Sequence, residues 1–346
     1  MEDAPQEGEA PVTTTAPHAN AAEIVASLPL ETRYPAFPLR QYAGFWLAET
    51  TVKAAVPLLH ARLQPRPDDV LIASFPKSGT TWLIALAFAA LNRSEHSPLA
   101  GDHPLRHCNP HDCVRFLDTE LAFAKNTADM DTLMDELEAL PSPRLLATHL
   151  PHSLLPERVM DESFGCRIVY ICRDPKDALV SLWHFTKKAA PAAVVDAQSF
   201  TFQEMFELFC EGRCPNGPQW HHVLQYWQES VRRPDKVMFL RYEEMLREPE
   251  RNLKKLAKFM GCEFSDEEEE AGVVRAIVEL CSLEKMKNME VNRSGSTKLG
   301  VKSESYFRKG VVGDWSRHMT PEMAQKLDKI VRDAVDGSGF TFASLA

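Results

Sequence analysis

The chain has 346 residues, of which 44% are hydrophobic, and its formal net charge is −10. This length suits one large α/β domain or two small ones, and the acidic charge argues against bulk binding to nucleic acid. The chain opens on Met1, Glu2 and Asp3 without a basic and apolar signal, and no apolar run reaches the roughly 20 residues that span a membrane, so no membrane partner is expected.

The eight cysteines form no C-x-x-C pair, and several lie inside apolar runs, where a free thiol behaves as a small core residue. We therefore expect a soluble protein of the reducing cytoplasm. Residues 1–33 are rich in Ala, Pro, Thr and Glu without periodicity, which predicts a disordered tail. Because there is no internal repeat and no obvious linker, residues 34–346 are predicted to form one domain.

Two segments follow the tail. Residues 37–46 carry several aromatic side chains, which would either pack in the core or form a lid or pocket wall. Residues 47–63 predict a helix.

The next stretch, residues 70–91, predicts a strand, a tight loop and a buried helix. The loop reads S-F-P-K-S-G-T-T-W at 74–82, between the apolar runs 70–73 and 83–91. Backbone N–H groups at the start of a helix favour an anion, most often a phosphate or sulfate. Lys77 adds a positive charge, and Ser78, Thr80 and Thr81 add hydroxyl donors. The ATP-binding pattern G-x-x-x-x-G-K-[ST] is not matched, because Lys77 precedes Gly79.

A segment rich in His and Cys follows at 103–113, with the sequence H-P-L-R-H-C-N-P-H-D-C. Its spacings match no common zinc pattern, so no metal is expected there. We expect a loop on the substrate side or plain surface, and whether His103, His107 or His111 touches a substrate stays open.

Two further strands end in residues suited to chemistry. Residues 145–148 and 167–172 predict buried strands, followed by His149 and Arg173. Because the carboxyl ends of parallel strands share one edge of a sheet, both side chains would face the same crevice as Lys77. Asp174 and Pro175 start a helix, and Ser181 lies two turns along it on the side of Asp174.

The second half is mostly helical. We predict helices at 219–231, 249–260 and 320–335, and a strand at 236–240. The long polar loop 291–310 concentrates positive charge, with Arg308, Lys309 and Gly310 at its end. An acidic protein that binds an anion needs such a local patch, and a loop this long is usually functional.

Together these elements predict an α/β fold with a central, mostly parallel sheet flanked by helices. Its crevice would transfer a charged group from a nucleotide, with the reacting hydroxyl near His149. One alternative is a small-molecule kinase that uses ATP and magnesium, although it would lack G-K-[ST] and a clear magnesium carboxylate. Another is a non-catalytic binder of a bisphosphate nucleotide, which Lys77, His149 and Ser181 argue against.

Four motifs, in this order and spacing, resemble the cytosolic sulfotransferases, and the plant-type members in style. They are F-P-K-S-G-T-T-W at 75–82, A-T-H-L-P at 147–151, Y-I-C-R-D-P-K-D-A-L-V-S at 170–181 and R-K-G-V-V-G-D-W at 308–315. The resemblance covers roughly residues 34–340. It implies transfer of a sulfuryl group from 3′-phosphoadenosine 5′-phosphosulfate to an acceptor hydroxyl, without a metal.

The resemblance also implies roles for individual residues. His149 would be the general base, Lys77 would stabilise the leaving phosphate, and Ser181 would be the third catalytic residue. Arg173 and Ser181 would hold the 3′-phosphate, joined by Arg308, Lys309 and Gly310. Trp82 would stack on the adenine, Trp220 would be a second aromatic on that side, and the segment 281–283 would complete the adenine wall. The full set of donor-binding residues that the resemblance implies is Lys77, Ser78, Gly79, Thr80, Thr81, Trp82, Arg173, Ser181, Trp220, Cys281, Leu283, Arg308, Lys309 and Gly310.

Two features depart from the family. The dimer motif K-x-x-x-T-V-x-x-x-E would start at Ser316 and end at Gln325, and only Thr320 matches it, which predicts a monomer or a weak dimer. Ala147 stands where many animal members have a Lys. The family implies a small acceptor, and a flavonoid or other phenolic, a hydroxyjasmonate or a steroid-like compound all fit.

Overall fold

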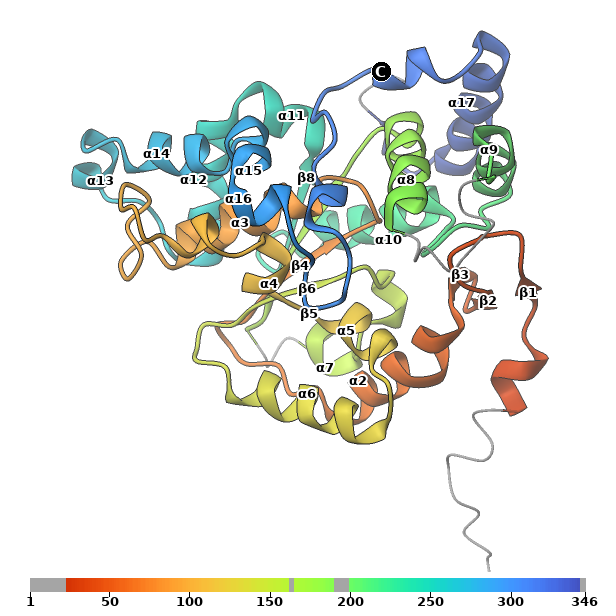
Figure 1. Cartoon of the computed structure of the whole chain (residues 1–346), viewed down its shortest axis with the longest axis horizontal. Coiled ribbons are helices and arrows are strands. Elements are labelled where there is room, and N and C mark those ends of the chain that lie inside the picture. Colours follow the sequence, from red (N-terminus) through yellow and green to blue (C-terminus); the bar gives the residue numbers. More distant parts are fainter. Residues whose placement is uncertain (1–22, 162–164, 190–198, 343–346) are drawn as a thin grey trace, which may run out of the picture.

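The computed structural model describes residues 23–161, 165–189 and 199–342. At its centre lies a five-stranded sheet with the order β5-β6-β4-β7-β8, and every neighbouring pair of strands is parallel (Figure 1). The α/β class and the parallel central sheet predicted from the sequence are confirmed. The strands are β4 (Val70–Ser74), β5 (Arg115–Phe116), β6 (Leu145–Thr148), β7 (Arg167–Cys172) and β8 (Val237–Arg241).

The sheet is buried on both faces, which explains why its strands are apolar without alternation. Along β4, Val70 and Ile72 face one hydrophobic cluster, whereas Leu71 and Ala73 face the other. Strand β5 has only two residues, too short to produce a pattern in the sequence, and it was not predicted.

Helices cover both faces of the sheet. One cluster contains residues of α3, α12, α14 and α15, and the other contains residues of α2, α5, α6, α8, α9, α10 and α17. Figure 1 shows α3 and α12 to α16 grouped on one side and α2, α5, α6 and α7 below the strands. Their bounds are α2 (Val56–Arg62), α3 (Thr80–Leu91), α4 (Pro110–Cys113), α5 (Leu117–Phe123), α6 (Thr127–Ala139), α7 (Glu157–Met160), α8 (Pro175–Ala189), α9 (Phe202–Cys210), α10 (Gln219–Arg232), α11 (Tyr242–Arg247), α12 (Pro249–Met260), α13 (Asp266–Glu270), α14 (Val273–Leu280), α15 (Leu283–Asn288), α16 (Glu290–Arg293) and α17 (Pro321–Val335).

The N-terminal segment corrects the predicted boundary of the tail at residue 33. Residues 23–27 are helical, and β1 (Leu30–Glu31) pairs with β2 (Leu39–Tyr42). Val25 is buried, and buried Glu31 forms ion pairs with Arg33 and Arg213, so tertiary contacts fix the chain well before Tyr34. The rest of the predicted tail, residues 1–22, lies outside the described residues.

The helix predicted at 47–63 starts too early. Strand β3 (Phe45–Ala48) pairs with β2 and also bridges to Gly217, so this pairing overrides the helical pattern. A π-helical turn η1 (Thr51–Ala55) then leads into α2. Phe45 and Trp46 of the aromatic segment are buried in the core, whereas Phe37 lines a cavity, so the segment serves both as core and as pocket wall.

The polar loop predicted at 291–310 holds short helices, α16 and the 3₁₀ turn η5 (Ser303–Tyr306). The other 3₁₀ turns are η2 (Pro104–Arg106), η3 (His152–Leu154) and η6 (Asp314–Arg317).

All eight cysteines lie among the described residues and are free thiols. In the part of the chain that the structure describes, no helix is long and apolar enough to cross a membrane.

Candidate active site

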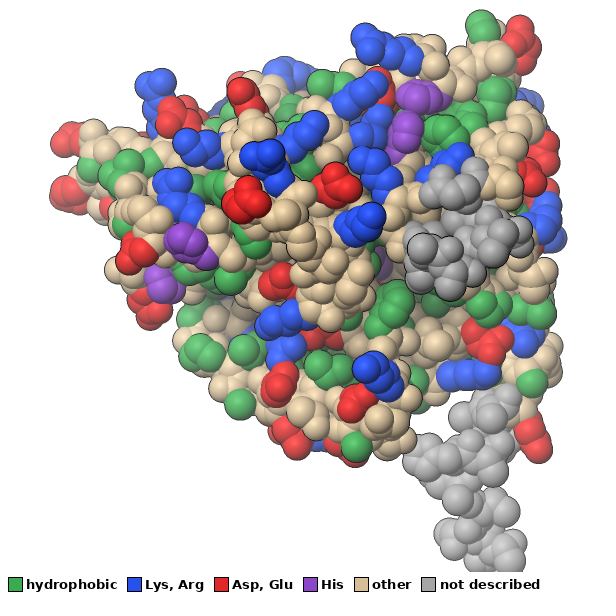
Figure 2. All heavy atoms as spheres, viewed as in Figure 1, with side chains coloured by type: hydrophobic (Ala, Val, Ile, Leu, Met, Phe, Trp, Pro, Cys, Tyr) green, Lys and Arg blue, Asp and Glu red, His purple; other side chains and the backbone are tan. Residues whose placement is uncertain are grey.

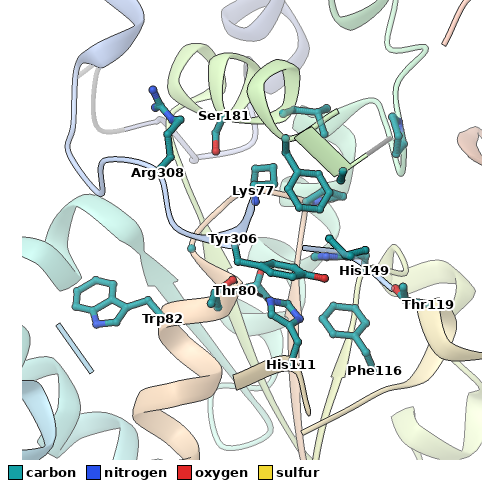
Figure 3. Close-up of a pocket in the computed structure, with 18 of the residues that line it drawn as sticks. Lys77, Thr80, Trp82, His111, Phe116, Thr119, His149, Ser181, Tyr306 and Arg308 are labelled. Atoms are coloured by element: carbon teal, nitrogen blue, oxygen red, sulfur yellow. Dashed lines mark hydrogen bonds between the residues drawn. The ribbon is translucent and has the colours of Figure 1, made fainter. Parts of the chain in front are cut away.

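A cavity of about 690 Å³ lies where the carboxyl ends of β4, β6 and β7 meet. Its wall includes Lys77 from the loop after β4, His149 from the end of β6 and Arg173 from the end of β7. Figure 3 shows these elements converging, with Ser181 and Arg308 above Lys77 and with Tyr306 and His111 below it. The sequence predicted this convergence.

The loop before α3 has a backbone that few residues can adopt. Lys77 and Gly79 have φ angles of 67° and 106°, and a Cβ added at Gly79 would lie 2.6 Å from Cδ2 of Tyr242. Only glycine fits there. The Ser74 and Thr80 hydroxyls are 2.7 Å apart and connect the strand to the first turn of the helix. Ser78, in the same loop, is fully buried and does not line the cavity, and its Oγ has no hydrogen-bond partner among the described residues.

Lys77 Nζ lies inside the cavity, 4.0 Å from the ring centroid of Phe185 and 5.7 Å from that of Tyr306. Burial, together with the charges of Arg173 and Arg308, lowers the pKa of Lys77 to about 7. An anion that binds beside Lys77 stabilises the charged form of its side chain. The local charge therefore favours a negatively charged ligand beside Lys77.

Arg173 stands beside Lys77 and is 5% exposed. Its guanidinium donates to the carbonyls of Val311 (3.0 Å) and Lys77 (3.4 Å), and it lies 4.6 Å from the ring centroid of Tyr242. Its buried Nε has no partner among the described residues. Ser181 lines the same cavity from α8, as predicted.

The segment 308–315 closes this end of the cavity. Arg308 and Lys309 both pair with Asp314, and the Lys309–Asp314 distance is 2.7 Å. Gly310 has a φ of 64°, and a Cβ there would lie 2.5 Å from Cδ2 of Leu283. Arg308 and Gly310 line the cavity, whereas Lys309 lines a neighbouring hollow that includes η6. On the face drawn in Figure 2, Lys and Arg side chains gather over α15 and η6, which carry Lys285, Lys287 and Arg317.

Asp177 fixes that segment to α8. It is fully buried, and its carboxylate accepts hydrogen bonds from the backbone N–H groups of Gly313 (2.7 Å) and Trp315 (3.0 Å). Asp174 caps the helix as predicted, because its Oδ1 accepts from the N–H of Lys176 at 2.8 Å. Nothing in the sequence around Asp177 indicates that its side chain reaches across to residue 313.

These observations test whether the predicted nucleotide donor fits. Three cations line one end of the cavity, from Lys77, Arg173 and Arg308. Arg173 Nε is buried there without a partner among the described residues, which is costly unless a ligand satisfies it. A nucleotide with negative groups at two places fits this end.

The predicted adenine wall is partly corrected. Trp82 and Tyr242 line the cavity, and their rings meet edge to face at 5.8 Å. Ser282 and Leu283 also line it. Cys281 is fully buried outside the wall, and Trp220 packs beside Phe209 in the core instead of reaching the cavity. The motif spacing placed both residues nearby but did not reveal which way they face, and Tyr242 was not predicted.

Hydrogen bonds fix both the ring and the backbone of His149. Its Nδ1 lies 2.7 Å from the carbonyl oxygen of Ser74, and because a carbonyl only accepts, Nδ1 carries the proton and Nε2 has a free lone pair. Its backbone N–H donates to Asp118 (3.0 Å), and its carbonyl accepts from Asn216 (2.8 Å) and His222 (3.0 Å). Burial is the main cause that lowers the pKa of His149, which keeps the imidazole neutral.

The other end of the cavity is apolar and aromatic. The His111 ring stacks on Tyr306 at 4.0 Å and lies 2.9 Å from the Thr81 hydroxyl, and burial lowers its pKa to about 3. Phe116 lies 4.6 Å from the ring of His149. Of the three histidines in the 103–113 segment, His111 lines the cavity, whereas buried His103 accepts a hydrogen bond from the N–H of Leu105. Among the residues that the structure describes, no group of three or more His, Cys, Asp or Glu side chains is placed to hold a metal ion.

Comparison with known proteins agrees with this geometry. Residues 67–339 match the family model of the sulfotransferase domain. Cytosolic sulfotransferase 10 of Arabidopsis thaliana is 41% identical over 319 residues, covering 92% of this chain and 93% of the relative. Cytosolic sulfotransferase 9 of the same plant is 40% identical over 328 residues, with 92% of each chain covered.

Solved structures agree with the fold. The crystal structure of an Arabidopsis thaliana protein assigned as a steroid sulphotransferase matches with a TM-score of 0.70 and 34% identity, covering 93% of this chain and 94% of that one. Mouse sulfotransferase SULT7A1, solved with PAP, matches with a TM-score of 0.65 and 26% identity over 87% and 95% of the two chains. This chain therefore belongs to the sulfotransferase family, as a plant-type cytosolic sulfotransferase that uses 3′-phosphoadenosine 5′-phosphosulfate as its donor.

Proposed function

We propose that the chain transfers the sulfuryl group to the hydroxyl of a small, uncharged acceptor, with His149 as the general base and Lys77 stabilising the leaving phosphate. The observation that carries this proposal is the hydrogen bond from His149 Nδ1 to the Ser74 carbonyl at 2.7 Å. It leaves Nε2 unprotonated, as a general base requires, and connects the base directly to the strand that ends in the phosphate loop.

The chemical step balances with these groups alone. The acceptor hydroxyl gives its proton to His149 Nε2, and its oxygen bonds to the sulfur of the donor. The bond from that sulfur to the bridging phosphate oxygen breaks, and this oxygen leaves with the electron pair. Lys77, buried beside the loop, meets the negative charge that develops there, where a desolvated cation acts most strongly.

The remaining donor groups have candidate partners at the cationic end of the cavity. Arg173, Ser181, Arg308 and Gly310 all line it, and they would hold the 3′-phosphate. The backbone of residues 78–81 at the start of α3 would hold the 5′-phosphosulfate. ATP, which lacks the 3′-phosphate, would leave buried cations without a partner and would be rejected.

The acceptor end favours an uncharged compound. Its wall includes Tyr34, Phe37, Phe116, Phe123 and Ala122, and the three cations among the described lining residues all belong to the donor end. Among the described lining residues the acidic group is Asp118, beside His149. A carboxylate would meet this acid without a cation to offset it. Phenolics such as flavonoids and steroid-like compounds therefore fit better than a hydroxyjasmonate, so a plant secondary metabolite or hormone is the expected substrate.

The test is transfer of labelled sulfate from the donor to a panel of these acceptors, without added metal. We expect transfer to one acceptor class, and a loss of about 10²- to 10⁴-fold in His149→Ala, the range for a general base. His221→Ala, which removes an exposed histidine of α10, should retain full activity. Full activity of His149→Ala would contradict the assignment of the base, and tight nucleotide binding without any transfer would contradict the reaction.

We further infer that the protein acts in the cytosol as a monomer or a weak dimer. The names of the Arabidopsis relatives support the cytosol. Thr320, which alone matches the dimer motif, accepts a hydrogen bond from the N–H of Met323 and so caps α17. Sedimentation equilibrium at micromolar concentration should give the mass of one chain, and a stable dimer would contradict this inference.

A further inference from the structure

Asp118 is a buried carboxylate on the first turn of α5, and it lines the cavity next to His149. Its Oδ1 accepts from the hydroxyl of Thr148 at 2.6 Å and from the backbone N–H of His149 at 3.0 Å. Both donors are neutral, and the described residues provide no salt bridge to Asp118. Burying a carboxylate in this way is costly, so the charge itself needs an explanation.

The explanation lies in the charge that His149 acquires during the reaction. Accepting a proton at Nε2 makes the ring an imidazolium inside a buried site. Burial and the charge of Lys77 both oppose this, whereas the charge of Asp118 favours it. The negative groups of the bound donor pair with the cations of the cavity. The new positive charge on His149 therefore needs an anionic partner of its own.

We propose that Asp118 is a positioning residue for His149: it fixes the backbone of the base and balances the charge of the imidazolium. This inference rests on the proposed role of His149. Asp118 donates no proton and need not touch the acceptor. It connects α5 to the end of β6, and the Thr148 hydroxyl completes the link by accepting from the N–H of Leu150 at 3.0 Å.

Other ionisable groups that face His149 come from three elements. Lys77 lies in the loop after β4, His111 on α4 and His222 on α10. Burial lowers the pKa of both His111 and His222 to about 3, so these rings stay neutral during an assay near neutral pH. His149 and Lys77 are therefore expected to shape the pH profile. His149 must be neutral to act, so it sets the acidic limb, and Lys77 must be charged, so it sets the basic limb.

The experiment measures kcat and kcat/KM against pH for wild type, Asp118→Asn and Thr148→Val. The asparagine keeps an oxygen that can accept both hydrogen bonds but removes the charge. We expect its acidic limb to move to lower pH by about one unit, and its plateau kcat to fall about tenfold, because a base with a lower pKa accepts the proton less readily. The basic limb and the affinity for adenosine 3′,5′-bisphosphate should not change.

Thr148→Val is the complementary control, since it removes the hydroxyl that donates to Asp118 and leaves the charge of Asp118 in place. Its acidic limb should stay at the wild-type position. An unchanged profile and plateau in Asp118→Asn would overturn the inference, and so would the same limb shift in Thr148→Val. If Asp118→Asn does not fold, Asp118→Ser removes the charge with a smaller side chain and should show the same shift.

The inference and the proposed function can fail separately. If His149→Ala is fully active, the base is wrong and the role of Asp118 fails with it. If His149→Ala is inactive while Asp118→Asn behaves like wild type, the base stands and only this inference fails.

Discussion

The two ends of the cavity are built in opposite ways. At the donor end, charge and backbone fix the geometry: Lys77 and Arg173 line it, and Asp177 binds the segment 313–315 through two backbone N–H groups. At the acceptor end, the wall consists of aromatic and aliphatic side chains from short elements, among them the segment before β2, α5 and residues 299–301. Binding at the donor end therefore depends on a few irreplaceable groups, whereas binding at the acceptor end depends on the combined shape of many side chains.

This contrast predicts different responses to mutation. A missing cation or backbone anchor at the donor end should affect every acceptor equally. A changed side chain at the acceptor end should alter the preference among acceptors and leave donor binding intact.

Lys77→Met should have the largest effect. Removing the buried cation leaves the charge on the leaving phosphate oxygen unopposed, so kcat/KM should fall by about 10²- to 10³-fold for every acceptor. Steady-state kinetics with two unrelated acceptors measures this loss. The matched control is Lys309→Met, which removes the same charge outside the main cavity and should cost much less. Equal losses in both variants would mean that net charge matters and the position of Lys77 does not.

Donor binding should depend on pH because the pKa of Lys77 is lowered to about 7 in the free protein. The anionic donor binds the charged form and raises this pKa, so affinity is full below pH 7 and falls as Lys77 loses its proton above it. The decrease should approach about tenfold per pH unit until the pKa of the complex is reached. Calorimetry in buffers with different ionisation enthalpies should show proton uptake at pH 8, and none in Lys77→Met.

Asp177→Asn should weaken donor binding by about tenfold, since hydrogen bonds to a charged acceptor are roughly twice as strong as neutral ones. The segment that carries Arg308 would lose its anchor on α8. Equilibrium binding of adenosine 3′,5′-bisphosphate gives the affinity, and thermal unfolding shows that the fold is retained. Unchanged affinity would show that the other contacts of residues 308–315 suffice.

Phe37→Ala should have the smallest effect and the most selective one. Phe37 lines the acceptor end and packs near Tyr34 at a ring distance of 5.2 Å. We expect KM for acceptors to rise about fivefold, the cost of lost apolar contact, with donor affinity unchanged. The rise should differ between a flat phenolic and a steroid. A change in donor affinity would contradict the separation between the two ends.

The same contrast explains how far the sequence could predict the site. His149 and Arg173 directly follow buried strands, and Lys77 lies in the loop after another, so the parallel sheet brings the three together and the local pattern was enough to find them. Asp118 and Tyr242 come from a short helix and from the residue after β8, and their positions depend on packing across the chain. Trp220 shows the reverse error, because a correct position along the chain did not determine which way its ring faces.

The fold shows the same limit. The four strands and the three helices of the second half that the sequence predicted lie within about one residue of their observed bounds, whereas helices such as α9 and α14 were not predicted individually. The hairpin of β2 and β3 and the two-residue strand β5 were not predicted. These strands form because they pair with other segments, and their own sequences show no clear strand pattern.

The anchor formed by Asp177 has a consequence for protein synthesis. Its partners, Gly313 and Trp315, lie 136 and 138 residues further along a 346-residue chain. The central strands and Lys77 leave the ribosome long before them. A nascent chain can therefore assemble its sheet early, but it acquires a complete donor site only when translation is nearly finished.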